Sequence, residues 1–560
     1  MFGFLHGLKC PLRIAAVSAA VVAGSCLTFF PGGNADAAPD PRDGLQCPHA
    51  LPTYRDWTPQ EVWAWSVRIC LGRLADMSMF GAGDGQSCAP AKAGDWPATR
   101  NLSAAFLDTI LNREPYRGTL HRSGVHIRCA LFSAQVDLSD MVSERPLRLT
   151  DSVFSRDLSL KSAKFRGHLS LDGSIVKGDF LAGNLSVDGN LTMGRNARFK
   201  HVRLTGAAVS GAMDLSGAHF DGLFDAARLQ VGGSLLMGGK ARFTEEIRLI
   251  SARIGGELRA DGSLFAGLFS AARLQVAESL FMRDASFRDI RLIGARIGGS
   301  LHLRKGRFDG DFDLTSATIA DELQLNTPPG KKSNTGKYGP PRWSENARLI
   351  LRNTRAGALN DTIDSWDGVK LDLVGFTYDR LGGLRATKDS IMAARPKEWL
   401  LDNWLAKQEG FEETFIPQPF EQLAKVLRES GHPVNADYLL MAKLTHLRDS
   451  PGTSTLTKAS LWIQYILIGY GYRTWLAILW FLALAALGAW VCGRVPPGRD
   501  MTLSERFWYS VDIAVPVFNL DKKHGAIDLP KRSRTYFYFH QMAGFVLISF
   551  ALAGLSGLTK

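Results

Sequence analysis

The chain has 560 residues, of which 46% are apolar, and this excludes a disordered protein and a disulfide-held miniature. Its formal net charge is +12, but the basic residues are spread along the chain and several lie beside apolar segments near the C-terminus. The charge therefore predicts a lipid bilayer as partner and no nucleic acid.

The N-terminus has the features of an export signal. Lys9 and Arg13 precede an apolar run from Ile14 to Phe30, and Ala35-Asp36-Ala37 offers a small-residue cleavage site. We expect residues 1–37 to be a signal peptide. An uncleaved anchor helix and a lipoprotein site remain alternatives.

Four cysteines lie in the segment that export would place outside the cytoplasm: Cys47, Cys70, Cys88 and Cys129. In an oxidising compartment this even number predicts two disulfides, with three possible pairings. Four buried free thiols are the alternative. Zinc fits less well because the chain lacks a Cys-x-x-Cys pair. We expect neither a metal nor a cofactor.

Residues 38–124 are predicted to form a helical N-terminal cap. Thr58-Pro59-Gln60-Glu61 has the residues of a capping box with proline at the first helical position. A second helix is expected from Ser103 to Asn112. A cap is needed because the open end of a stacked β-structure would expose unpaired backbone groups.

Residues 147–325 repeat a unit of eleven residues in the form apolar-x-x-x-apolar-x-apolar. Ile297, Leu301 and Leu303 are an example, and Phe308, Phe312 and Leu314 follow eleven residues later. A helix would place apolar residues at i+3, i+4 and i+7, so short strands with glycine-rich corners fit better. The sequence predicts a mainly β protein with a right-handed parallel β-solenoid over residues 125–325.

The lead position of the unit alternates between aliphatic and aromatic residues, so the full repeat has about 22 residues. Stacked turns would then bury Val and Ile in one column and Phe in another, with Phe243, Phe265 and Phe287 one over the next. Outward residues of the Phe half should form a column of mostly alternating charge. Its members are Arg203, Asp225, Arg248, Ser270, Arg291 and Asp313.

Two segments of the repeat, Ala218-His219-Phe220-Asp221-Gly222 and Asp214-Leu215-Ser216-Gly217-Ala218, resemble the five-residue steps of pentapeptide-repeat proteins. The resemblance covers about a third of the chain and implies a square β-helix. Some members of that family mimic DNA, a role that implies an acidic cytoplasmic rod. This chain is basic and has the features of an export signal, so it does not fit that role.

After the solenoid, residues 326–346 are rich in Pro, Gly and Lys and are predicted to form an exposed loop. Final coils are expected at 347–394. Residues 395–458 are predicted to be helical, with an αα-hairpin at Phe420–Ser430 and Pro433–Arg448. The hairpin resembles a single tetratricopeptide unit, which needs a neighbour for stability.

Residues 459–560 are predicted to form a membrane region with two transmembrane helices, at Thr474–Cys492 and Tyr536–Leu558. The basic residues between them favour a cytoplasmic connecting loop. The solenoid is therefore predicted to lie in the periplasm, anchored in a bacterial inner membrane.

The order of solenoid, hairpin and two spans resembles a group of uncharacterised bacterial membrane proteins sometimes labelled membrane-associated oxidoreductases. That label implies a dinucleotide site. Such a site needs a strand, G-x-G-x-x-G and a helix in succession, and Gly81-Ala82-Gly83-Asp84-Gly85 has neither the spacing nor the context.

Three sets of residues are candidate sites. Asp309, Asp311 and Asp313 would share one face of a strand, where they could hold a cation or sugar hydroxyls or be a solvated face. Asp512 lies in an apolar stretch, residues 507–520, that either re-enters the membrane or lies at its interface. Leu236 and Phe281 would form an outward apolar patch for a protein partner or a second copy, or would pack under a loop.

We expect the chain to be a binding or scaffolding surface for envelope proteins or polysaccharide, and not an enzyme. A pore or transport-associated component built on the two spans is the alternative. A carbohydrate-active enzyme is a third reading, since parallel β-helices host such enzymes and paired carboxylates perform their acid and base steps.

Overall fold

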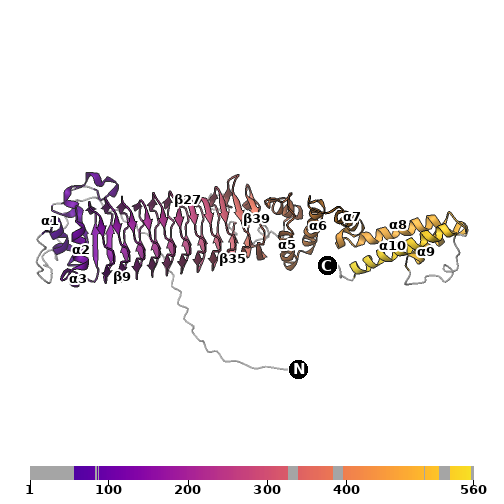
Figure 1. The fold of residues 1–560 in the computed structure, drawn as a ribbon, viewed down its shortest axis with the longest axis horizontal. Helices are drawn as coiled ribbons and strands as arrows, with labels where there is room; N and C mark the ends of the chain where they lie inside the picture. Colours follow the sequence, from indigo (N-terminus) through magenta and orange to yellow (C-terminus); the bar gives the residue numbers. More distant parts are fainter. Residues whose placement is uncertain are drawn as a thin grey trace, which may run out of the picture. The chain divides into compact units, whose positions relative to one another are not determined.

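The computed structural model describes residues 56–81, 83, 85, 87–325, 339–382, 395–496, 498–515 and 530–555. Its strands form two parallel sheets of 21 and 19 strands, wound as a solenoid of about 11 turns (Figure 1). Helices flank the solenoid at both ends, and two C-terminal helices are long and apolar enough to cross a membrane. The predicted fold class is confirmed. The predicted signal peptide lies outside the described residues.

One turn of the solenoid consists of four two-residue strands joined by corners. A representative turn contains β13 (Ser186–Val187), β14 (Leu191–Thr192), β15 (Arg198–Phe199) and β16 (Val202–Arg203). Asp140, Asp151, Ser162, Gly173 and Asn184 have positive φ and follow one another at intervals of eleven residues. Each half-turn thus needs one left-handed corner, which Gly, Asn and Asp adopt most easily. This need explains the eleven-residue unit.

The Phe column predicted from the repeat is present in the core. It runs along β15, β19 (His219–Phe220), β23 (Arg242–Phe243), β27 (Leu264–Ser270), β30 (Ser286–Arg291) and β33 (Arg307–Phe308). Phe243 and Phe265 have ring centroids 5.0 Å apart, and Phe265 and Phe287 are 4.5 Å apart with nearly parallel planes. Rings stacked at the strand spacing therefore pack closely along the core.

The outward column of the Phe half also has the predicted register. Arg203 lies opposite Asp225, Asp225 opposite Arg248, and Arg291 opposite Asp313. The pairing with Ser270 in between is likewise as expected. Opposite charges on adjacent strands of this sheet therefore offset one another.

The N-terminal cap packs on the first turn. It contains α1 (Pro59–Trp63), the π-helix η1 (Ala64–Ile69), the 3-10 segments η2 (Met77–Met79), η3 (Pro90–Asp95) and η4 (Ala98–Arg100), α2 (Ala104–Asn112) and α3 (Tyr116–Thr119). The predicted capping box is present, and the buried Glu61 also accepts a 2.7 Å hydrogen bond from the Ser103 backbone N–H. A strand that the sequence did not predict, β1 (Ala75–Asp76), pairs with β2 (Val125–Arg128) and covers the edge of the sheet.

The solenoid resumes earlier than predicted after residues 326–338, which lie outside the described part. β36 (Arg342–Trp343) pairs with β33, and Trp343 stacks on Phe308 at 4.8 Å. The prediction of an exposed loop at 326–346 is therefore wrong for its last residues. Trp343 takes the place of a Phe at this level of the column, so the strand that carries it belongs to the solenoid. The final coils contain β37 (Arg348–Ile350), β38 (Arg355–Asn360), the 3-10 segment η6 (Ile363–Trp366), β39 (Lys370–Asp372) and β40 (Thr377–Leu381). Residues 383–394 lie outside the described part.

The C-terminal end of the solenoid is closed by α4 (Lys397–Asp402), the 3-10 segment η9 (Leu405–Lys407) and the predicted αα-hairpin, α5 (Gln418–Glu429) and α6 (Pro433–Asp449). The Gln418 side chain accepts from Gly375 N–H and donates to the Phe376 carbonyl, both at 2.9 Å. The Gln422 amide donates to the Tyr378 carbonyl at 2.7 Å. Glutamine side chains thus replace the backbone partners that a further turn would supply.

The last part contains α7 (Thr455–Ile468), the 3-10 segments η10 (Gly469–Gly471) and η11 (Gly498–Asp500), α8 (Trp475–Cys492), α9 (Leu503–Ala514) and α10 (Lys531–Leu555). α8, α9 and α10 pack together. The candidate spans are Trp475–Cys492 and Lys531–Ala553, close to the predicted ones. α8 exposes Trp475, Leu479 and Trp490, as a helix in lipid would.

Candidate functional site

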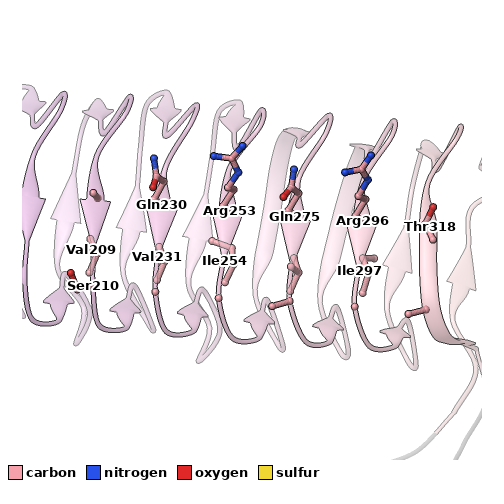
Figure 2. A pocket seen from close by; sticks show the side chains of 17 residues that line it. Val209, Ser210, Gln230, Val231, Arg253, Ile254, Gln275, Arg296, Ile297 and Thr318 are labelled. Atoms are coloured by element: carbon pink, nitrogen blue, oxygen red, sulfur yellow. The ribbon is translucent and has the colours of Figure 1, made fainter.

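A groove of about 710 Å³ runs across one face of the solenoid (Figure 2). It crosses six successive strands: β17 (Ala208–Val209), β21 (Gln230–Val231), β25 (Arg253–Ile254), β28 (Gln275–Val276), β31 (Arg296–Ile297) and β35 (Thr318–Gln324). At the strand spacing this is roughly 24 Å of continuous surface. Such a length suits an extended ligand better than a compact one.

One side of the groove is a ladder of polar side chains, here called the wall. In register from turn to turn, Gln230 lies opposite Arg253, then Gln275, Arg296 and Thr318. Figure 2 shows the labelled wall side chains pointing the same way. The wall thus presents amide and guanidinium donors at regular spacing.

The floor of the groove consists of small residues: Ser210, Gly232, Gly255, Ala277, Gly298 and Ala320. A Cβ on Gly232, Gly255 or Gly298 would collide with the carbonyl oxygen of the turn before it. The fold itself therefore requires these glycines, and the hollow follows from their lack of side chains. Any argument for a ligand must rest on the wall.

The structure places Leu236 and Phe281 on the neighbouring face of the same sheet. Leu236 on β22 (Leu235–Leu236) is half-buried, and Arg259 on β26 (Leu258–Arg259) separates it from Phe281 on β29 (Leu280–Phe281). Phe281 is only 9% exposed. The predicted apolar patch therefore has little accessible surface, and partner binding there stays a prediction.

Charged and aromatic neighbours cover the Phe281 ring. Arg259 and Arg283 each lie 4.5 Å from its centroid, and His302 stacks on it at 4.4 Å. Burial lowers the pKa of His302, the hydrogen bond to Gln324 opposes this shift, and Arg283 and Arg304 add to it. Stacking and cation–π contacts explain an outward Phe without invoking a partner.

The three predicted carboxylates do not share one strand. β33 ends at Phe308 and β34 (Asp311–Asp313) begins after the corner at Gly310, so Asp309 belongs to a different side of the turn. The prediction of one face is wrong because a corner interrupts the alternation. Arg348 binds Asp311 through two hydrogen bonds of 2.8 and 2.5 Å, and the Asp313 carboxylate accepts from Thr315 N–H at 2.8 Å. A ligand role for these residues remains a prediction.

Asp512 lies on α9, half-buried where this helix packs against α8 and α10. The same packing contains a pair that the sequence did not single out, because only the fold brings it together. His540 on α10 is 1% exposed, and its Nε2 lies 3.1 Å from both the hydroxyl and the carbonyl oxygen of Ser510. A Cβ on Gly488 of α8 would collide with the Ser510 hydroxyl, so three helices meet there.

Two of the predicted disulfide cysteines form a bond with each other. A disulfide joins Cys88 to Cys129, whose Cα atoms are 5.4 Å apart. This bond links the cap to the corner after β2. Cys70 is also disulfide-bonded. Cys47 lies outside the described residues. The prediction of disulfides is therefore confirmed for Cys70, Cys88 and Cys129.

No protein family, curated protein or solved structure matches this chain. The parallel solenoid is consistent with the predicted likeness to pentapeptide-repeat proteins in fold. Neither the fold nor the comparisons support the oxidoreductase label.

The groove was missed by sequence reasoning although a signal was present. The wall residues each precede the aliphatic lead residue of their turn by one position, as Gln230 precedes Val231 and Arg253 precedes Ile254. Reading that position down the 22-residue repeat would have shown alternating Gln and Arg. The hollow beside this column exists because the glycine positions lack side chains. It could be recognised only once the turns were seen stacked on one another.

Proposed function

We propose that this chain is a membrane-anchored β-solenoid that acts as a binding or scaffolding surface on the periplasmic side of a bacterial inner membrane. The groove is its main binding surface, for an envelope protein or a polysaccharide. The observation that carries this proposal is the polar wall, which crosses successive turns at regular spacing beside an open floor.

The disulfide bond and the C-terminal helices support the compartment. A structural disulfide is typical of an oxidising compartment outside the cytosol. α8 and α10 are long and apolar enough to span a bilayer, and α8 exposes large apolar side chains that lipid would cover. α7 exposes Trp462, Ile463 and Ile466, which suits a helix lying along the membrane interface.

Site-specific photo-crosslinking in intact cells tests this function. A photoreactive residue at Gln275, in the wall, should give discrete adducts, and one at Ala266, exposed on the other sheet, should not. Ala277→Trp should abolish the adducts, because Ala277 is an exposed floor residue and a large ring there fills the groove. Ala266→Trp is the matched control, since Ala266 is exposed on the other sheet. Equal adducts at both positions, or none at Gln275, would reject the groove as the binding surface.

A pore or transport-associated component is the second candidate, and the buried Ser510–His540 pair favours it. Polar groups buried between helices long and apolar enough to cross a bilayer are often part of an ion or proton path. In proteoliposomes, His540→Phe, Ser510→Ala and Asp512→Asn should each reduce ion flux if such a path exists. Flux equal to that of empty liposomes for the unaltered protein would exclude this candidate.

A further inference from the structure

Four successive turns each carry one arginine in the groove or at the corner just before its wall strand. Arg253 and Arg296 are wall residues, whereas Arg228 and Arg273 stand two residues before the wall glutamines of their own turns, at corners with φ of 59° and 57°. A Cβ on Gly294, the corner of the next turn, would lie 3.7 Å from Arg273 Cγ, so this side chain follows the edge. These four residues are called the arginine row. They are exposed, and the row is about 14 Å long at the strand spacing.

Within the described residues, none of the four side chains of the arginine row has an ion pair or a side-chain hydrogen bond to a protein group. On the other sheet, Arg203, Asp225 and Arg248 alternate in sign, and Arg248 is also 2.6 Å from Glu246. In the wall the residues between the arginines are glutamines instead. Along the chain, Asp225 lies three residues before Arg228 and Glu257 four residues after Arg253, whereas Glu278 and Asp321 follow the floor residues Ala277 and Ala320.

No two arginines of the row lie directly opposite each other, because Gln275 separates Arg253 from Arg296 in the register and Arg228 and Arg273 lie at corners. This stagger limits the repulsion between them without removing their net charge. An anion from outside the chain would remove it. A guanidinium binds a carboxylate through two parallel hydrogen bonds, which gives both attraction and orientation.

We propose that the groove binds an extended acidic polysaccharide whose carboxylates lie on the arginine row, an inference that rests on the proposed function. The wall amides and the Thr318 hydroxyl hydrogen-bond the sugar hydroxyls. Arg253 and Arg296 are two turns apart, roughly 10 Å at the strand spacing. This distance is comparable to the length of one disaccharide in an extended chain, so a polymer with a regular carboxylate can meet both.

Nucleic acid fits this groove less well. The lining residues include no aromatic side chain, whereas single-stranded nucleic acids are bound largely by stacking of bases on aromatic rings. The Cys88–Cys129 disulfide also favours a compartment in which polysaccharide, and not nucleic acid, is the abundant polyanion.

The test uses the full chain in non-ionic detergent and a labelled linear polygalacturonate fragment, with its methyl ester as the uncharged control. The variant carries Arg253→Gln, Arg296→Gln, Arg228→Ser and Arg273→Ser. Each substitution copies a residue already found at the same level of the repeat: Gln230 and Gln275 in the strand, Ser251 and Ser316 at the corner with φ of 58°. The fold should therefore be kept, as circular dichroism will show.

The matched control changes four exposed arginines of the other sheet to serine: Arg203, Arg242, Arg291 and Arg307. Their columns already contain Ser270 and Ser286. We expect polygalacturonate binding that weakens with salt, at least about tenfold weaker binding by the groove variant, and less than about twofold change in the control. The methyl ester should bind at least about tenfold more weakly than the acid.

Equal binding of acid and ester, an unaltered affinity in the groove variant, or an equal loss in the control would overturn the inference. Tighter binding of oligothymidylate than of polygalacturonate of equal charge would overturn it in favour of nucleic acid. If polygalacturonate fails to bind while the Gln275 crosslinks persist in the groove variant, only this inference falls. If both fail, the proposed function falls with it.

Discussion

At the residue scale, single side chains stabilise the solenoid through contacts with the turns above and below. Phe265 is 1% exposed and stacks on Phe243 and Phe287. The ring therefore contributes to three turns at once. A cavity at this position cannot be filled by neighbours that are themselves held in register.

Phe265→Ala should lower the free energy of unfolding by about 3–5 kcal/mol, because it removes buried apolar surface and leaves a cavity. Urea unfolding followed by circular dichroism measures the change. Ala266→Ser, next to it on the exposed side, should change stability by less than about 0.5 kcal/mol. Similar midpoints for both variants would mean that the Phe column does not hold the turns together.

A buried ion pair joins the final coils to the C-terminal helices. The Arg395 guanidinium donates to both Asp361 oxygens at 2.9 and 3.0 Å, and both side chains are almost fully buried. Desolvation raises the pKa of Asp361, against the opposing charge of Arg395. Asp361→Ala should destabilise the protein by about 3–5 kcal/mol, since a buried cation is left without its partner. Thermal unfolding measures this, and a loss below about 1 kcal/mol would contradict it.

The exposed pair of Asp311 and Arg348 should behave differently and should depend on pH. The hydrogen bonds from Arg348 lower the pKa of Asp311 below its ordinary value of 3.8. Its stabilisation is therefore present above 3.8 and is lost as the pH falls through the lowered pKa. Because both side chains are about 40% exposed, the pair contributes no more than about 1 kcal/mol. The difference in unfolding free energy between the protein and Asp311→Asn should disappear in acid, and a constant difference would contradict this.

At the element scale, the ends of the solenoid are closed by different devices. The N-terminal end gains a strand, β1, and a disulfide, whereas the C-terminal end is covered by α5 and its glutamines. Both devices satisfy backbone groups that a further turn would otherwise bond. The αα-hairpin is thus stabilised by the solenoid that it caps.

Gln418→Ala should expose the last coil to fraying. It leaves the Gly375 N–H and the Phe376 carbonyl without their partners, which costs about 1–3 kcal/mol if water cannot replace them. Hydrogen exchange should become faster in β39 and β40 and should remain unchanged in β13 to β16. Gln275→Ala, which removes an amide from the groove, is the control and should leave exchange in β40 as it was.

At the scale of the whole molecule, the proposed function requires the solenoid and the segment between the two candidate spans to lie on opposite sides of a membrane. Glu345 on the solenoid and Asp500 after α8 are both exposed. Cys492, the free cysteine of the described part, is buried and should contribute little background. Labelling of introduced cysteines can therefore report the side of each segment.

Glu345→Cys should react with a membrane-impermeant maleimide in cells whose outer membrane has been permeabilised, and Asp500→Cys should react only after the inner membrane is opened. This follows from two spans with a positively charged connection on the cytoplasmic side. Reaction of both in intact inner membranes would contradict the proposed orientation. Release of the protein by alkaline carbonate would contradict the spans themselves.

The sequence alone determined the fold and its inner columns. An aliphatic residue such as Val231 and an aromatic residue such as Phe243 each recur about every 22 residues. A parallel stack places equivalent positions of successive turns over one another, so the repeat period predicts which residues are in contact. The capping box at Thr58 and Glu61 was equally predictable because its partners are three residues apart. Local spacing and strict repetition need no knowledge of the rest of the chain.

The tertiary structure alone decided the groove, the cover of Phe281 and the closing strand β1. The groove depends on Gly232 and Gly255 lying against the carbonyl groups of the preceding turns. The sequence predicted Phe281 to be exposed apolar surface, whereas in the structure Arg259 and Arg283 lie over its ring. These features depend on contacts between side chains about 22 residues apart, or on contacts with the cap. The direction in which each side chain points decides these contacts, and the repeat period does not give that direction. A repeat predicts which residues are stacked, whereas the surface depends on how the outward side chains fill the space between turns.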